Sequence, residues 1–302
     1  MFEIIICTYN GKHNLVKVIP SILNQNKFDE LVMSIFIVDN NSDIETKQII
    51  KKYEKSCNKI KYLLEEKQGL SFARLKGVQN TTANWLIFID DDNVLEQNWL
   101  INADNFIKTN NNMGAFNGAI IPEIKSKLDN YENIRLKVAY KALACTHLSK
   151  SEINFANTKH PIDSPIGAGL VILGNEMREL SSKGWLKNIG RQGEKLSSGE
   201  DKEMVDYIIF KGFDVGYTPH CLIYHLITNN RLKEEYLIIL HESFKRYKVI
   251  SLRGIKDFLK NVLFSLCLLR KDLDYESIFR LRIGAITTAN ALRILFKGRK
   301  IE

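Results

Sequence analysis

Three consecutive aspartates, Asp90, Asp91 and Asp92, directly follow the apolar run at residues 86–89. Neighbouring carboxylates repel one another, so a fold that collects three of them must supply a compensating charge or hydrogen bonds. A bound Mg²⁺ or Mn²⁺ would supply the charge, because both ions prefer hard oxygen ligands. Magnesium usually takes only one or two protein carboxylates and completes its shell with phosphates, so the missing ligand would be a diphosphate. The competing interpretation is a solvated acidic turn or a helix N-cap.

The elements that position these aspartates follow from the spacing of apolar residues. Apolar runs predict strands at residues 2–10, 33–42, 60–66 and 84–92, and each run ends in polar residues. Helical spacing predicts helices at residues 45–55 and 70–79, and another over residues 15–23 that Pro20 should bend or restart. Strands that alternate with amphipathic helices imply an α/β fold, with a parallel sheet covered on both faces.

In such a sheet, ligands bind beyond the carboxyl ends of the strands, where neighbouring loops converge. Thr8 and Tyr9 follow the first predicted strand, Asp39 ends the second, and the aspartates at 90–92 end the fourth. We therefore expect all of these side chains along one edge of the sheet.

Composition limits the class of protein. A chain of 302 residues, 45% hydrophobic and 26% charged, can bury a sizeable core in one large domain, or in one domain with an appendage. Five scattered cysteines without a CxxC pair favour a reducing compartment over a disulfide scaffold or a zinc ribbon. With no signal-peptide pattern and no apolar run long enough to span a membrane, we expect a cytoplasmic protein.

Four segments follow one another along the chain: IIICTYN, IVDNNSD, GLSFARLKGV and FIDDDN. In this order they resemble the opening strand, the acidic loop after the second strand, the Gly/Arg helix and the DxD motif of the family 2 glycosyltransferases with the GT-A fold. SGEDKEMVDYIIFKGFDVGYTP resembles their catalytic ED segment and the strand after it. The resemblance covers about residues 1–225, and it is closest to members that build bacterial polysaccharides. It implies a GT-A domain, Rossmann-like and mostly parallel, at 1–225, with a basic, amphipathic helical region at 226–302.

The resemblance implies a site for the nucleotide of a sugar donor. Asp39 would accept a hydrogen bond from the base, and Thr8 and Tyr9 would form the wall beside it, the tyrosine ring serving as a stacking platform. Arg74 would lean toward the base or the diphosphate, because its planar fork suits anions. The other interpretations are a core tyrosine, a loop-capping aspartate and a surface arginine.

It also implies a metal site and a catalytic acidic pair. Asp90 would lie near the ribose and the metal with Asp91 beside it, Asp92 would bind Mn²⁺ or Mg²⁺ directly, and His225 would complete the metal shell, with His220 as its competitor. Asp201 would be the base that removes the proton of the acceptor hydroxyl, and Glu200 would orient the acceptor or a backbone amide. Acidic residues also favour the first turn of a helix for purely structural reasons.

The acceptor side is less defined. Gly167 and Gly169 would allow close approach of a sugar, or form a plain turn before the strand at 170–173. Trp185, in a long Gly/Ser/Lys loop, would offer a platform for an acceptor sugar, or it is buried. Residues 131–150 are rich in helix formers and would add to the acceptor side.

The net charge of +8 resides entirely in residues 226–302, which contain 16 Lys and Arg against 8 Asp and Glu. Apolar stripes with basic flanks predict helices at 231–252, 255–272 and 278–300. They form either a peripheral contact with anionic membrane at the cytoplasmic face, reaching a lipid-linked acceptor, or a buried subdomain or dimer contact. No nucleic-acid reading motif accompanies the basic charge.

Three functions therefore compete. The first is a metal-dependent inverting transferase that moves a sugar from a nucleotide-diphosphate sugar, a UDP-sugar being the preferred donor, to a saccharide or lipid-linked acceptor in polysaccharide or glycoconjugate assembly. The second is a nucleotidyltransferase, although CTYNGKHN contains only one glycine for a phosphate-binding loop. The third is a nucleotide-sugar-binding protein without turnover.

Overall fold

The computed structural model describes residues 1–156, 165–184, 186, 190–191, 199–243, 275 and 279. The chain forms two compact units. The first comprises Met1–Glu123 and Ala144–Ile227, and the second comprises Ile124–Leu143 and Thr228–Glu302. All the predicted site residues lie in the sequence of the first unit, although Trp185 is outside the described residues.

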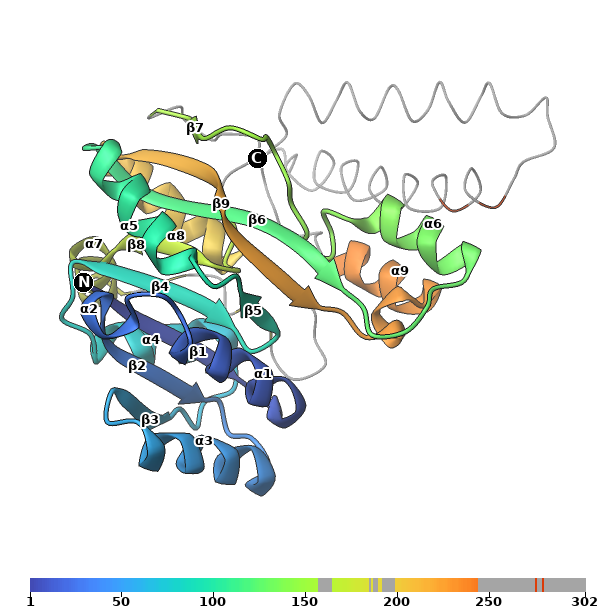
Figure 1. Ribbon diagram of the computed structural model, residues 1–302, viewed down its shortest axis with the longest axis horizontal. Coiled ribbons are helices and arrows are strands. Elements are labelled where there is room, and N and C mark those ends of the chain that lie inside the picture. The colour runs from blue at the N-terminus through green and yellow to red at the C-terminus, as the bar shows by residue number, and fades with distance from the viewer. Residues whose placement is uncertain are drawn as a thin grey trace, which may run out of the picture. The chain divides into compact units, whose positions relative to one another are not determined.

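The first unit is a sheet with helices on both faces (Figure 1). Its described strands are β1 (Phe2–Thr8), β2 (Val32–Asp39), β3 (Ile60–Leu64), β4 (Trp85–Asp90), β5 (Asn93–Leu95), β6 (Met113–Glu123), β7 (Ile153–Asn154), β8 (Leu170–Leu173) and β9 (Asp214–Leu226). Its described helices are α1 (Lys12–Leu23), α2 (Phe28–Leu31), α3 (Ile44–Ser56), α4 (Leu70–Gln79), α5 (Trp99–Thr109), α7 (Gly174–Ser182) and α8 (Glu200–Phe210).

The strand order is β3-β2-β1-β4-β8-β6-β9-β5, and β7 also pairs with β9. Strands β1 to β4 are mutually parallel where they pair, and β6 pairs with β9 in parallel. Strand β8 runs antiparallel to β4 and β6, and β5 runs antiparallel to β9. The predicted mostly parallel α/β sheet is confirmed, and the first four predicted strands are its parallel half.

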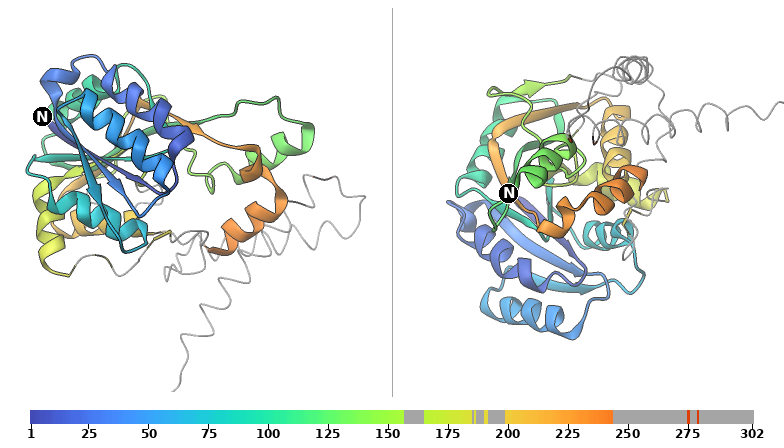
Figure 2. Two further views of the ribbon diagram at one scale, coloured as in Figure 1. Left: turned by 90° about the horizontal axis from the view of Figure 1, so that it is seen from below. Right: turned by 90° about the vertical axis from the view of Figure 1, so that its right-hand side faces the viewer.

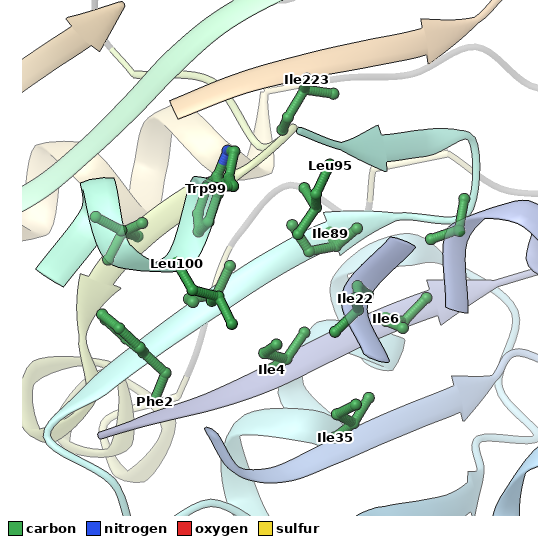
Figure 3. Packing of buried hydrophobic residues seen from close by; sticks show 14 of the residues in the cluster. Phe2, Ile4, Ile6, Ile22, Ile35, Ile89, Leu95, Trp99, Leu100 and Ile223 are labelled. Atoms are coloured by element: carbon green, nitrogen blue, oxygen red, sulfur yellow. The ribbon is translucent and has the colours of Figure 1, made fainter. Parts of the chain in front are cut away.

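Burial on both faces explains why these strands read as unbroken apolar runs. Ile4 and Ile6 of β1 belong to a core cluster that includes residues of α1, α3 and α5. The alternate residues Ile5 and Cys7 belong to a second cluster, with residues of α4, α7 and α8. Figure 2 shows the helices on the two sides of the sheet, and Figure 3 shows Ile4 and Ile6 on the side of β1 that faces Ile22 of α1.

The predicted helices agree with the structure in place and extent, with one correction. Helix α3 begins after Asp43, whose side chain accepts a hydrogen bond from the Thr46 amide at 2.8 Å. Helix α1 runs from Lys12 to Leu23 with Pro20 inside it, so the prediction that proline restarts this helix is wrong. Val18, Ile19 and Ile22 are fully buried on either side of the proline, and this packing outweighs the local cost of Pro20.

The second unit contains α6 (Asn130–Ala139), the 3-10 helix η1 (Asn229–Leu232) and α9 (Glu234–Ser243). Asp129 and Glu132 form a capping box at the start of α6, within the stretch predicted to favour helix. Of the three helices predicted after residue 230, the first is described only over α9, and those at 255–272 and 278–300 lie outside the described residues except for 279. No helix that the structure describes has the length and apolar character needed to cross a membrane.

A charge cluster next to α7 makes the stability of the first unit depend on pH. Glu179 pairs with Lys183 and, at 2.9 Å, with Lys211 after α8. These lysines lower the pKa of Glu179 from its ordinary 4.5 to about 2. Its contribution to stability is therefore complete above about pH 4.5 and is lost as the pH falls toward about 2. Urea unfolding should show Glu179→Gln less stable than the wild type near about pH 6, and a difference that does not shrink near about pH 3 would contradict this.

Candidate active site

Thr8, Asp39 and Asp90 lie at the ends of three adjacent parallel strands. Thr8 of β1 pairs with Asp39 of β2, and Cys7 pairs with Asp90 of β4. Tyr9 follows β1 and is 44% exposed. The strand order changes direction at β1, and a sheet of this kind binds ligands beyond the strand ends at that point. The structure thus brings these predicted residues to one edge.

Asp39 is fully buried and already has two hydrogen-bond donors. The Ser42 amide donates to its Oδ1 at 2.7 Å, and the hydroxyl of Tyr62 donates to its Oδ2 at 2.8 Å. Burial, together with the adjacent Asp39 carboxylate, raises the pKa of Tyr62, which therefore remains a protonated donor. Tyr62 was missed in the sequence because it lies on β3 and makes its contact 23 residues away along the chain.

Asn40 holds the loop that leads into α4. Its Oδ1 accepts a hydrogen bond from the Gly69 amide at 2.8 Å, and its Nδ2 donates to the carbonyl of Lys67 at 2.8 Å. Asn40 follows Asp39 in the DNNSD loop, so its position at a strand end was the only signal in the sequence. Its contacts position Gly69, the N-cap residue of α4, the helix that carries Arg74.

The three aspartates have three different sets of partners. Asp90 lies 3.6 Å from Nη2 of Arg74, Asp91 accepts a hydrogen bond from the Thr8 hydroxyl at 2.5 Å, and Oδ2 of Asp92 lies 3.2 Å from Nε2 of His225. Asn93 adds a hydrogen bond to Oδ1 of Asp92 at 3.1 Å. The expected repulsion is thus met largely by protein groups that arrive from β1, α4 and β9.

Asp90 retains an unfavourable electrostatic environment. Partial burial raises the pKa of its carboxyl, Arg74 lowers it, and the neighbouring Asp92 raises it further. The net shift is upward. A cation bound beside Asp90 and Asp92 would relieve the repulsion that remains between them.

Asp92 and His225 bring a carboxylate and an imidazole together at the acidic turn. Their facing atoms are 3.2 Å apart, close to the roughly 3 Å between adjacent ligands of an octahedral ion with bonds of about 2.1 Å. Within the described residues, no cluster of three or more His, Cys, Asp or Glu side chains is arranged to hold a metal. Two protein donors would leave the rest of an octahedral shell to phosphates and water, as Mg²⁺ usually requires.

Strand pairing determines which histidine faces Asp92. Asn93 of β5 is the partner of His225 on β9, and His225 is 4% exposed. His220 is exposed, five residues earlier on the same strand, and its carbonyl accepts a hydrogen bond from Asn102 at 2.7 Å. The structure brings His225, and not His220, to the aspartates.

Helix α8 carries the predicted acidic pair at its first turn. Gly199, at a φ of 116°, is the N-cap residue and leads into Glu200. Glu200 is buried, 3.0 Å from Nη1 of Arg74, and burial raises its pKa while Arg74 opposes the shift. Asp201 is partly exposed, and its two oxygens accept hydrogen bonds from the amides of Gly167 and Lys202, each at 2.8 Å. Of the pair, Asp201 is the one accessible to a ligand.

Two other predicted residues have surroundings that the sequence did not specify. Arg74 is 2% exposed and faces Glu200 and Asp90, so it is not a surface arginine. Gly169 adopts a φ of 67° before β8, a conformation that favours glycine.

The sequence of residues 3–152 matches the family model described as Glycosyl transferase family 2. The chain belongs to this family. The matched segment of the family 2 chain contains Thr8, Asp39, Arg74 and the three aspartates, and ends before Glu200, Asp201 and His225.

Curated relatives share part of the chain. A GalNAc(5)-diNAcBac-PP-undecaprenol beta-1,3-glucosyltransferase from Campylobacter jejuni is 33% identical over 95 residues, which is 31% of this chain and 30% of that protein. The poly(ribitol-phosphate) beta-N-acetylglucosaminyltransferase TarS from Staphylococcus aureus is 24% identical over 212 residues, which is 65% of this chain and 37% of that protein. The family 2 chain thus matches about a third of the length of each of these relatives.

The crystal structure of residues 1–349 of S. aureus TarS aligns with 99% of this chain and 91% of the TarS chain, with a TM-score of 0.56 and 14% identity. A longer TarS structure aligns with 97% of this chain and 53% of its own, with a TM-score of 0.57 and 13% identity. The fold of the family 2 chain is the GT-A fold, as the sequence motifs implied.

Proposed function

We propose that the chain is a metal-dependent, inverting glycosyltransferase. It transfers a sugar from a nucleotide-diphosphate sugar, with a UDP-sugar as the first candidate, to a hydroxyl group of its acceptor. The observation that carries this proposal is the buried Arg74, which contacts Asp90 at the sheet edge and Glu200 beside Asp201. Arg74 thus connects the aspartates at the sheet edge, which suit a metal and a diphosphate, with the first turn of α8, where the Asp201 carboxylate is accessible. Both features occur in a chain that belongs to family 2.

The nucleotide would bind at the ends of β1 and β2. Tyr9 is exposed there and offers its ring to the base. Asp39, which the resemblance assigns to the base, accepts hydrogen bonds from Tyr62 and Ser42, and these two donors fix its buried carboxylate at the end of β2. Thr8 and Asp91 bind each other and hold the start of the loop after β1 against the acidic turn.

Mn²⁺ or Mg²⁺ would be held by Asp92 and His225, with Asp90 alongside. The bound ion supplies Lewis-acid stabilisation of the negative charge on the leaving diphosphate. Asn93 orients Asp92 through its hydrogen bond, and the pairing of β5 with β9 keeps His225 in place.

Asp201 acts as the general base. It accepts the proton of the acceptor hydroxyl while that oxygen forms a bond to the anomeric carbon, and the bond from this carbon to the diphosphate oxygen breaks with inversion. The Gly167 and Lys202 amides hold the carboxylate of Asp201 in one orientation, and each oxygen keeps further lone-pair capacity for the incoming proton.

The acceptor belongs to polysaccharide or glycoconjugate assembly. The names of the relatives support this class, since one is named for a diphosphate-linked undecaprenol saccharide and another for poly(ribitol phosphate). The corresponding acceptor is a saccharide or a lipid-linked saccharide. We assign Gly167 and Trp185 to the part of the site that would receive it. Contact of residues 226–302 with anionic membrane, and self-association, complete the proposal. Pelleting with anionic vesicles and sedimentation would test these two points.

A donor screen tests the function. UDP-, GDP- and dTDP-sugars are added with and without Mn²⁺, and thermal unfolding is followed, because a ligand that binds only the folded state raises its stability, by about 2.7 kcal/mol at 100 times Kd. We expect stabilisation by one nucleotide-sugar class in the presence of Mn²⁺, and slow hydrolysis of that donor. Binding without any turnover, even with acceptors, would favour a binding protein, and release of pyrophosphate from a nucleoside triphosphate would favour a nucleotidyltransferase.

A further inference from the structure

Arg74 is surrounded by acidic groups and has almost no contact with solvent. It lies 3.0 Å from Oε1 of Glu200 and 3.6 Å from Oδ1 of Asp90, and its guanidinium is 5.6 Å from the centre of the Phe88 ring. Asp90 ends β4 and Glu200 begins α8. The buried guanidinium of Arg74 therefore connects the edge of the sheet with the helix that carries Asp201.

Gly167 contacts both sides of this connection. A β-carbon at residue 167 would collide with Nη2 of Arg74, and the Gly167 amide donates the hydrogen bond to Oδ2 of Asp201 at 2.8 Å. Unlike Gly169, Gly167 has no positive φ that would by itself favour glycine. A β-carbon at this position would therefore displace the guanidinium from its place between Glu200 and Asp90.

We propose that Arg74 and Gly167 are positioning residues, which together set the place of the Asp201 carboxylate relative to the donor edge. The inference rests on the proposed function, in which Asp201 is the base. Arg74 holds Glu200, and hence the first turn of α8, at a fixed separation from Asp90. Gly167 leaves room for the guanidinium and fixes the orientation of Asp201 through its amide. Neither residue has to contact the donor or the acceptor.

The planar fork of arginine is needed for this role. Nη1 contacts Glu200 and Nη2 contacts Asp90, so the two carboxylates are held by different nitrogens of one rigid group. A lysine ammonium is a single point of charge and does not reproduce both contacts at these separations. Arg74→Lys therefore retains the charge and loses the geometry.

A double-mutant cycle tests the proposal. Gly167→Ala should lower kcat by about 10- to 100-fold, the cost of misplacing a catalytic group by about an ångström, with a much smaller change in donor KM. Arg74→Lys should lower kcat similarly. Both substitutions act on the same thing, the position of the Asp201 carboxylate. The kcat of the double variant should therefore be no lower than that of the less active single variant.

Gly216→Ala is the matched control. Its added β-carbon would come within 2.8 Å of Met113 Cε on β6, so it overpacks the core without contacting Arg74. We expect lower thermal stability and an unchanged kcat. Losses that multiply in the double variant, or an equal loss of kcat in the control, would overturn the positioning role. Should Gly167→Ala not fold, a full kcat in Arg74→Lys would overturn it as well. A wild-type protein without transferase activity would instead reject the proposed function.

Discussion

Asp201→Asn is expected to lower kcat by about 10²- to 10⁴-fold and to leave donor affinity near the wild-type value. The magnitude is that of a lost general base, because the amide cannot accept the proton of the acceptor hydroxyl. Donor binding is preserved because its proposed contacts lie at β1, β2 and the acidic turn. Calorimetry with Mn²⁺ and steady-state kinetics measure the two quantities separately.

The substitution also has a structural cost that must be measured. The carboxylate accepts hydrogen bonds from Gly167 and Lys202, and an amide nitrogen would face one of these donors. Thermal unfolding of the variant therefore belongs in the experiment. Glu203→Gln is the control, since it removes another negative charge from the first turn of the same helix. Turnover at the wild-type rate in Asp201→Asn would remove this residue from the mechanism.

Asp92→Ala should weaken donor binding in the presence of Mn²⁺ by more than about 100-fold, down to the level seen without the ion. Loss of a direct ligand should exceed the 10- to 100-fold typical of groups that only support a ligand. His225 and Asp90 would remain, but Asp90 is already paired with Arg74 at 3.6 Å, and a single imidazole is a poor site for a hard cation. Calorimetry with and without Mn²⁺ measures the metal-dependent part of the affinity.

Asp104→Ala supplies the comparison for that experiment. Asp104 lies on α5 and pairs with Lys108 at 2.6 Å, so the variant removes an aspartate outside the proposed site. Its donor affinity should be that of the wild type. If Asp92→Ala kept its Mn²⁺-dependent affinity, the metal would have to bind elsewhere.

The parallel half of the sheet could be predicted because its signals are local. Each of β1, β2 and β4 is buried along most of its length, and an unbroken apolar run followed by polar residues records that burial directly. The common edge of Thr8, Asp39 and Asp90 then follows from parallel pairing alone. Pro20 does not restart α1, because tertiary packing of the helix overrides the local preference of proline.

The partners of the site residues could not be predicted in the same way. Thr8 and Asp91 are 83 residues apart, Arg74 and Glu200 are 126 apart, and Asp92 and His225 are 133 apart. No spacing rule relates residues at such separations. The pairing of β6 with β9, which builds the other half of the sheet, is hidden for the same reason. The family resemblance supplied the candidate residues, and the structure supplied their contacts.

The register of β9 restricts how this chain can vary in length. Side chains on a strand alternate between its two faces, and His225 occupies the position opposite Asn93. One residue inserted between Ile223 and Tyr224, in the stretch of β9 that pairs with both β5 and β6, would shift that alternation and place Tyr224 opposite Asn93. The side chain of Tyr224 would then replace the imidazole of His225 as the neighbour of Asp92. Natural or engineered variants should therefore tolerate insertions in the surface loops long before they tolerate one here.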